Sequence, residues 1–281
     1  MPSATLLGQS VLSGIVIGSL YGLLGLGLSM SWGMLRQVNL AHFALAFLGG
    51  YLTFQLSGRL DPFVALAVIA PLFFLAGVAL HWFLTRFSVN LLNTLLVTFG
   101  LTSIIEAAIQ WIWTADFHRM ESAYAGVRWR LGPLFLALPD LLTLLFALGL
   151  SAALWAVLRY TDLGKAMRAV AEDGPMAAAF GIDHKRLALM LSGVCGVLAG
   201  IAGVCLALSY TLTPAQIYAW VGVVFAAVML GGLGSPVGPL VAGIVIGVSE
   251  ALTAAIASPS WSPIVSFTLL IVILLVRPGK V

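Results

Sequence analysis

Charged residues are sparse in this chain and are most concentrated in one polar island, residues 159–186, near its middle. The island holds five of the 13 Lys and Arg residues and four of the ten Asp and Glu residues, although only 8% of the chain is charged. Each charge placed at the centre of a bilayer costs about 2.5–3.5 kcal/mol or more. The island therefore lies in water, and its basic excess favours the cytoplasmic side of a membrane.

Apolar segments of membrane-spanning length fill most of the remaining chain, which is 61% hydrophobic. A spanning helix needs roughly 20 apolar residues. The segments that qualify are 8–32, 38–56, 63–84, 91–113, 141–158, 187–210, 218–233, 240–256 and 264–276. Some are short or interrupted by glycine, so we predict an all-α integral membrane protein, a polytopic bundle of about eight to ten transmembrane helices.

Basic residues predict the orientation of this bundle. With the island inside, the inner connections and the C-terminus carry Arg36, Arg86, Arg159, Lys165, Arg168, Lys185, Arg186, Arg277 and Lys280. The outer side carries Arg59, Arg119, Arg128 and Arg130. This asymmetry follows the positive-inside rule and places the N-terminus outside and the C-terminus in the cytoplasm.

The chain is predicted to be one transmembrane domain, residues 1–281, with two long loops. The island, 159–186, is the cytoplasmic loop, and residues 114–139 form an external loop. The external loop is either a solvated cap or a docking surface for an external partner.

Polar residues inside the apolar segments are candidates for lining a solute pathway. The candidates are Asn39, His42, Glu106 and Glu250. Ionisable groups at membrane depth face a cavity or a partner rather than lipid. Each candidate could instead be hydrogen-bonded within the packed bundle, and Glu106, one turn from Gln110, could reach interfacial water. The sequence contains no His, Cys, Asp or Glu cluster with metal-ligand spacing, so we predict no metal and no cofactor.

Glycines form two further patterns. Small residues four apart predict close helix packing in lipid, and this spacing occurs at Gly14, Gly18 and Gly22, at Gly196 and Gly200, and at Gly243 and Gly247. A separate set lies between two apolar segments and comprises Gly231, Gly232, Gly234 and Gly238. This second set predicts a tight reversal of the chain.

The island itself has the pattern of a short amphipathic helix. Asp162 is the predicted N-cap, and an apolar stripe follows at Leu163, Ala166, Met167 and Val170. Pro175 is placed to begin a second helical piece, which Gly181 closes. The stripe is narrow, which suits a shallow protein groove better than the surface of a bilayer.

The sequence around each lysine excludes nucleotide hydrolysis through a Walker A loop in this chain. A Walker A loop needs Gly-Lys-Ser/Thr, and the only lysines, Lys165, Lys185 and Lys280, lie in other contexts. We also find no catalytic constellation, so we predict that the chain is not an enzyme.

Three stretches of the chain resemble ABC importer permeases of the branched-chain amino acid family. Residues 161–173 (TDLGKAMRAVAED) and 178–182 (AAFGI) resemble the cytoplasmic loop of that family. Residues 18–22 (GSLYG) with 32–42 (WGMLRQVNLAH) resemble its N-terminal signature, and 231–241 (GGLGSPVGPLV) its C-terminal glycine motif. The similarity covers essentially the whole chain in the right order.

The resemblance implies a permease subunit of the shorter, LivH-like type in a bacterial inner membrane. Such a subunit pairs with a second permease, two ATP-binding subunits and a periplasmic substrate-binding protein. Residues 163–181 are then the coupling region that docks on an ATPase subunit, where Gly164 is expected to admit the partner's backbone. The implied coupling residues are Leu163, Gly164, Ala166, Met167, Arg168, Val170, Glu172 and Gly181.

The implied function is ATP-driven import of leucine, isoleucine, valine or a related small solute such as urea or a short amide. Two alternatives stay open from the residues alone. The first is a stand-alone secondary transporter or channel for a small polar solute. The second is a membrane-embedded enzyme, which the lack of a catalytic pattern disfavours.

Overall fold

Each predicted apolar segment forms a helix in the computed structural model, which describes residues 3–276 apart from 59, 88–89, 121–123 and 125. The helices are α1 (Ala4–Leu35), α2 (Ala41–Ser57), α3 (Pro62–Phe87), α4 (Leu91–Trp113), α5 (Leu138–Tyr160), α8 (His184–Ser209), α9 (Ile217–Gly231), α10 (Gly238–Ile256) and α11 (Ser262–Val276). Among the described residues, seven helices are long and apolar enough to cross a membrane. The helices α2 and α11, with 17 and 15 residues, are shorter, whereas α9 reaches 18 residues together with the 3-10 turn that precedes it. The prediction of an all-α polytopic membrane protein is confirmed.

The two long loops also contain regular structure. The island forms α6 (Asp162–Glu172) and α7 (Gly174–Ala179), and the external loop contains β1 (Arg128–Leu131) and β2 (Leu134–Ala137). Two short 3-10 turns, η1 (Pro214–Gln216) and η2 (Pro259–Trp261), precede α9 and α11. The antiparallel hairpin was not predicted. Its two-residue turn begins at Gly132, whose φ of +64° fits the first turn position of a type II′ hairpin.

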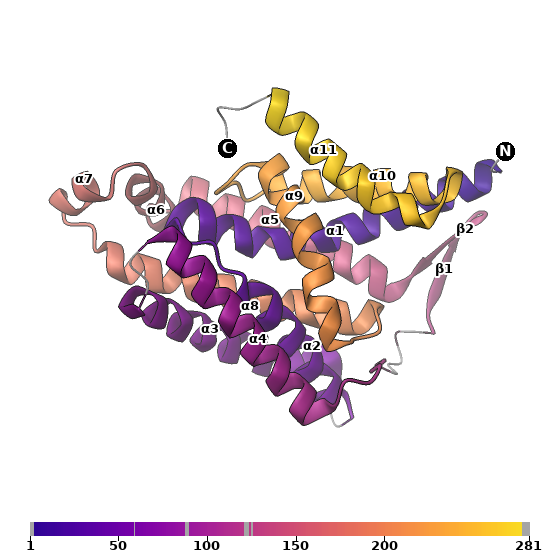
Figure 1. Cartoon of the computed structure of the whole chain (residues 1–281), viewed down its shortest axis with the longest axis horizontal. Coiled ribbons are helices and arrows are strands. Elements are labelled where there is room, and N and C mark those ends of the chain that lie inside the picture. The colour runs from indigo at the N-terminus through magenta and orange to yellow at the C-terminus, as the bar shows by residue number, and fades with distance from the viewer. Residues whose placement is uncertain (1–2, 59, 88–89, 121–123, 125, 277–281) are drawn as a thin grey trace.

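The connections gather at two opposite ends of the bundle (Figure 1). At one, the hairpin end, Gln9 Nε2 near the start of α1 donates a hydrogen bond of 2.9 Å to the Phe135 carbonyl of β2. At the other, the island end, Arg36 Nη2 just after α1 donates one of 3.2 Å to the Ala171 carbonyl of α6. The N-terminal end of α1 therefore lies at the same end of the bundle as the external loop. The C-terminal end of α1 lies at the same end of the bundle as the island, as the charge pattern predicted.

The described basic residues are unevenly divided between these ends. At the island end α1, α3 and α5 finish and α8 begins (Figure 1), so this end carries Arg36, Arg86, Arg159, Lys165, Arg168, Lys185 and Arg186. The hairpin end carries Arg119, next to the bridge between His118 and Leu212, and Arg128 and Arg130 of β1. Arg59, Arg277 and Lys280, which entered the predicted orientation, lie outside the described residues. Which end faces the cytoplasm stays a prediction.

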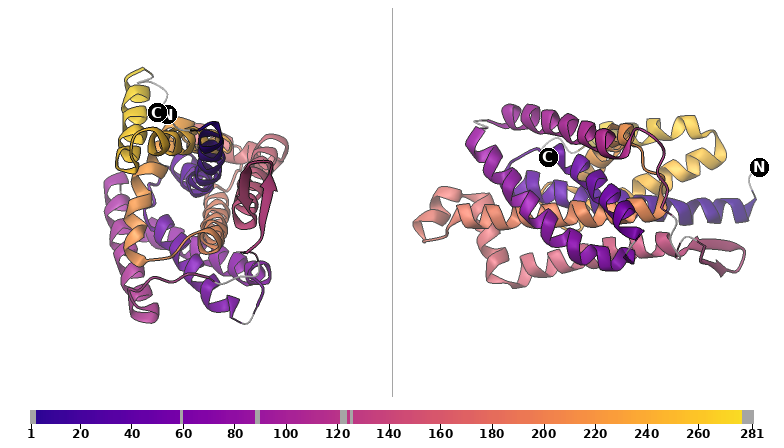
Figure 2. Two further views of the ribbon diagram at one scale, coloured as in Figure 1. Left: turned by 90° about the vertical axis from the view of Figure 1, so that its right-hand side faces the viewer. Right: turned by 90° about the horizontal axis from the view of Figure 1, so that it is seen from below.

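The helices α1 and α8 form the centre of the bundle, and the remaining helices pack around them (Figure 2). Helix α1 lies against α10, while α8 lies against α2 and α3. A Cβ atom on Gly18 would overlap the backbone of Gly243, and one on Gly243 would overlap that of Gly18. A Cβ on Gly196 of α8 would overlap the Phe73 carbonyl of α3. The glycine spacing thus permits backbone contact between helices, as predicted.

We expect Gly18→Leu to reduce the yield of monodisperse folded protein severely. A leucine side chain cannot enter the α1–α10 contact without separating two backbones, and overpacking of this kind costs about 1–3 kcal/mol or more. The measurement is size-exclusion chromatography in detergent. Gly149→Leu on α5 is the matched control, because Gly149 is exposed and a Cβ there meets no atom within 4 Å. Equal yields from the two variants would contradict the assigned packing.

Candidate functional site

The island begins with a helix cap that differs from the predicted one. Thr161, not Asp162, is the N-cap of α6, and its hydroxyl accepts a hydrogen bond of 3.1 Å from the Gly164 amide. Asp162 is the first helical residue and pairs with Lys165 Nζ at 2.9 Å. This hydrogen bond lowers the pKa of the exposed Asp162 carboxyl. The preference of a helix N-terminus for acidic side chains explains Asp162 equally well in its observed position.

One face of α6 packs on the rest of this chain, so the prediction that Gly164 admits a partner's backbone was wrong. Gly164 is buried, and a Cβ there would overlap the backbone of Val157 and Leu158 in α5. Met167 and Val170 line a small pocket over the last turn of α1 and the first turns of α8. Part of the predicted stripe therefore holds α6 on the bundle instead of facing outward.

The other predicted residues of α6 lie toward water. Leu163 is 51% exposed, and Ala166 is half-buried. Arg168 and Glu172 are both exposed. Among the residues that the structure describes, no ion pair joins them.

Helix α7 contributes exposed apolar residues that the sequence reasoning missed. Asp173 caps α7, since its Oδ1 accepts a hydrogen bond of 3.0 Å from the Met176 amide. Gly181, with a φ of +83°, lies just beyond its end. Met176 and Phe180 are 57% and 83% exposed. Their spacing of four residues, between a proline and a helix-ending glycine, was the signal available in the sequence.

Helices α6 and α7 together form a projection from the island end (Figure 1). Its outer surface carries Leu163, Met176 and Phe180, and its base is fixed to α5 by Gly164 and to α1 by the Arg36 hydrogen bond. We call this outer surface the projecting face. It combines exposed apolar side chains with a firm attachment, which is the arrangement of a docking surface.

Glu250 lies at a junction of three helices. The Tyr21 hydroxyl of α1 donates a hydrogen bond of 2.9 Å to Glu250 Oε2, and the Ser266 hydroxyl of α11 donates one to Oε1. The Tyr21 ring makes an edge contact with Trp220 of α9, with centroids 5.6 Å apart. The carboxylate is thus paired within the chain.

Asn39 and His42 lie where the chain breaks between α1 and α2. His42 is 1% exposed, its Nε2 lies 3.1 Å from the Leu24 carbonyl oxygen, and its ring occupies the space that a Cβ on Gly27 would need. Asn39 is 7% exposed, yet its Oδ1 has no hydrogen-bond partner among the described residues. Of these two neighbours, His42 is hydrogen-bonded and the Asn39 oxygen is not.

Glu106 lies apart from the other candidates, on the outer side of α4. Gln110 Nε2 donates a hydrogen bond of 3.2 Å to Glu106 Oε1. Glu106 is half-buried and Gln110 is exposed. Within the described part of the chain, no hydrogen bond joins Glu106, Glu250 or the Asn39 and His42 pair to one another. The structure therefore gathers no single polar site from these candidates.

The second glycine set forms the reversal between α9 and α10. Gly232 and Gly234 have φ angles of +90° and +74°, which side chains with a Cβ rarely adopt. Gly231 and Gly238 face each other, and a Cβ on either would overlap the backbone of the other. The Gly234 amide also donates a hydrogen bond of 3.0 Å to the Ser29 carbonyl of α1. The reversal is thus held against the last part of α1.

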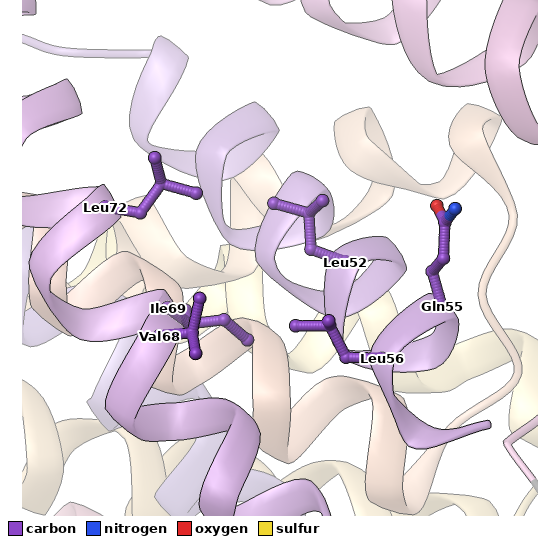
Figure 3. A pocket seen from close by; sticks show the side chains of 6 residues that line it. All are labelled: Leu52, Gln55, Leu56, Val68, Ile69 and Leu72. Atoms are coloured by element: carbon purple, nitrogen blue, oxygen red, sulfur yellow. The ribbon is translucent and has the colours of Figure 1, made fainter. Parts of the chain in front are cut away.

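A cavity of about 480 Å³ lies between α2 and α3 (Figure 3). Its lining comprises Leu52, Gln55, Leu56, Val68, Ile69 and Leu72. Five of these side chains are aliphatic, and Gln55 supplies the one polar group of the set. The cavity suits an aliphatic group and offers no charge to a zwitterion.

Comparisons with known proteins cover nearly the whole chain. The sequence profile of the family described as branched-chain amino acid transport system / permease component matches residues 10–274. The permease protein LivH of the high-affinity branched-chain amino acid transport system of Escherichia coli (strain K12) is 28% identical over 306 residues, which cover 96% of this chain and 93% of that protein. No solved structure matches the chain.

Two further relatives have similar coverage. The corresponding permease protein BraD of Pseudomonas aeruginosa is 26% identical over 303 residues, covering 96% of this chain and 94% of the relative. The probable branched-chain amino acid transport permease protein LivH of Methanocaldococcus jannaschii is 26% identical over 295 residues, covering 96% and 91%.

The contrast between His42 and Asn39 predicts opposite effects on stability. His42→Leu removes a buried hydrogen bond and disturbs the fit over Gly27, so we expect a loss of about 1 kcal/mol or more. Asn39→Leu replaces a buried oxygen without a described partner by an apolar group of similar shape, so we expect no loss or a small gain. Thermal unfolding in detergent measures both. A lower melting temperature for Asn39→Leu than for His42→Leu would contradict the described contacts.

Proposed function

The chain belongs to the branched-chain amino acid transport permease family, and on that premise we propose that it is the membrane subunit of an ATP-driven importer. The cargo is leucine, isoleucine or valine, or a related small solute such as urea or a short amide. The match of residues 10–274 to the family carries this proposal. Residues 1–281 act as one permease domain in a bacterial cytoplasmic membrane, with the island on the cytoplasmic side.

ATP hydrolysis takes place in partner subunits, and the projecting face of α6 and α7 is the surface on which one of them docks. The assembly comprises this chain, a second permease, two ATP-binding subunits and a periplasmic substrate-binding protein. Phe180 and Met176 are well placed as anchors, since exposed aromatic and Met side chains are enriched in protein interfaces. Leu163 of α6, 51% exposed, is a further apolar side chain available to the partner.

The attachment of α6 gives the docked subunit a route to the centre of the bundle. Met167 packs near Met34 of α1 and Leu191 of α8, and Arg36 links the end of α1 to α6. A displacement of α6 therefore moves α5, on which Gly164 packs, together with the two central helices, α1 and α8. Because packed interfaces shift between discrete arrangements, this movement converts an outward-facing pathway to an inward-facing one.

We propose different roles for the four polar candidates. Asn39 lines the pathway, because its side-chain oxygen is buried and has no described partner, whereas Glu106 lies on an outer helix surface and faces a polar neighbour outside this chain. His42 and Glu250 position the helices around it, because each has hydrogen-bond partners in the bundle. The aliphatic cavity between α2 and α3 suits the side chain of a branched amino acid in transit.

Reconstitution tests the proposed function directly. Proteoliposomes that contain this chain, its permease partner, the ATP-binding subunits and the binding protein are expected to take up labelled leucine only when ATP is enclosed. Uptake by this chain alone, driven by an ion gradient or by the leucine gradient, would establish a secondary transporter or channel instead.

Phe180→Asp is expected to reduce ATP-driven uptake about tenfold or more. Truncation of an interface anchor costs about 2 kcal/mol, and a charged side chain on an apolar contact adds a desolvation penalty. Phe117→Asp at the hairpin end is the matched control, because Phe117 is 79% exposed and Phe180 is 83% exposed. Both variants should insert and elute normally. Co-purification of the ATP-binding subunits is measured beside uptake, because Phe117 lies in the loop that could bind the periplasmic protein. Equal co-purification with Phe180→Asp and with the control would remove α7 from the docking surface.

A further inference from the structure

Helix α4 lies at the edge of the bundle and is the least covered of the seven spanning helices (Figure 2). Its inner face packs on α2 and carries Thr94, Thr98, Thr102 and Ile109. The Thr98 hydroxyl accepts a hydrogen bond of 3.2 Å from the Leu40 amide, which fixes α4 to the break before α2. The opposite face of α4 is exposed apart from its contact with Tyr218 at the start of α9.

This outward face is not the uniformly apolar surface that lipid favours. Ser103, Glu106 and Gln110 follow one another at spacings of three and four residues, so they form one stripe along the helix. Gln110 is hydrogen-bonded to Glu106, and Ser103 Oγ lies 3.2 Å from the Tyr218 hydroxyl at the start of α9. The Phe99 ring completes this contact, with its centroid 6.1 Å from that of Tyr218.

The position of Glu106 makes exposure to lipid costly. It lies seven residues before the end of α4, or about 10 Å below it at 1.5 Å per residue. Ionisable groups at such depth face protein or water, because a carboxylate in hydrocarbon is strongly unfavourable. One hydrogen bond from Gln110 leaves most acceptor positions of the carboxylate open. Something polar therefore covers this face.

Small residues on the same face indicate that the covering group is a helix. Gly100, Ser103 and Ala107 are all exposed, and a Cβ on Gly100 would meet no atom within 4 Å. Such residues allow two helix backbones to approach closely in a membrane, while hydroxyl and amide groups join them by hydrogen bonds. A pathway for a small solute would need polar groups on this face, but it would not need small residues that expose the helix backbone. The small residues therefore favour a packed helix.

We propose that the outer face of α4, together with Tyr218 of α9, is the surface on which the second permease subunit packs. This inference rests on the proposed function, because both permeases must present their docking loops to ATPases on the same side of the membrane. The pairing axis then runs along the membrane normal, so α4 meets a helix of the partner at the same depth. Amide and hydroxyl groups of that helix complete the hydrogen bonding of Glu106.

Site-specific photo-cross-linking of the assembled importer in membranes tests this surface. Leu96, at the centre of the face and 58% exposed, is replaced by p-benzoylphenylalanine, and Leu145 on α5, 54% exposed, is the matched control. We expect irradiation to join position 96 to a permease subunit, identified by peptide mass spectrometry, and position 145 to lipid or nothing. A cross-link to the permease from 145 and not from 96 would overturn the proposal.

The same probe at Phe180 separates this inference from the proposed function. A cross-link from position 180 to an ATP-binding subunit, with none from 96 to a permease, would leave the function intact and reject the α4 surface. If position 96 reaches the permease and position 180 reaches no ATP-binding subunit, the pairing surface stands and the coupling assignment fails. If neither position forms its expected cross-link, both the α4 surface and the coupling assignment are rejected.

A packing variant gives an independent measurement. Ala107→Phe places bulk in the middle of the small-residue strip, and Ala152→Phe adds the same bulk to an exposed position on α5. We expect Ala107→Phe to reduce co-purification of the second permease at least tenfold, with the chain itself still monodisperse. Ala152→Phe should leave co-purification unchanged. Equal recovery of the partner with both variants would reject the α4 surface.

Discussion

Backbone contact between glycine-lined helix faces is the interaction on which this bundle depends. Lipid tails are as apolar as leucine, so helices in a membrane associate through close packing and hydrogen bonds rather than through hydrophobic burial. In this chain α1 meets α10 at Gly18 and Gly243, and α8 meets α3 at Gly196. Both central helices are thus positioned by contacts that no larger residue permits, and the peripheral helices take their places from them.

The same environment decides where polar side chains lie. Glu250 receives hydrogen bonds from Tyr21 and Ser266, and His42 is hydrogen-bonded to the Leu24 carbonyl. The Tyr21–Glu250 contact joins helices that are distant in sequence, and the other two join consecutive helices. Groups left without such partners, the Asn39 oxygen and the outer side of Glu106, become the places where solute, water or another subunit is needed.

Periodicity and composition predicted the helices well, because the length of an apolar run is a local property. The side of the helix toward which a residue points was harder to predict from the sequence. Gly164 was assigned to a partner's backbone, but it packs on α5, since the chain turns sharply at Thr161 and folds α6 back on its own bundle. The partners of Glu250 could not be predicted, because Tyr21 is 229 residues away. Met176 and Phe180 were not singled out from the sequence, because an exposed apolar pair and a buried one look the same in a sequence. Only the surrounding structure distinguishes them.

The α1–α10 contact also has a consequence for biosynthesis. Gly14 contacts Gly247 and Val248, so α1 finds this neighbour only after the more than 200 residues between them have been made. At roughly 5–20 residues per second, this interval is on the order of 10–50 s. During that time the glycine face of α1 waits in the membrane without its permanent neighbour. The nascent chain therefore depends on the insertion machinery to keep the glycine face of α1 available for α10.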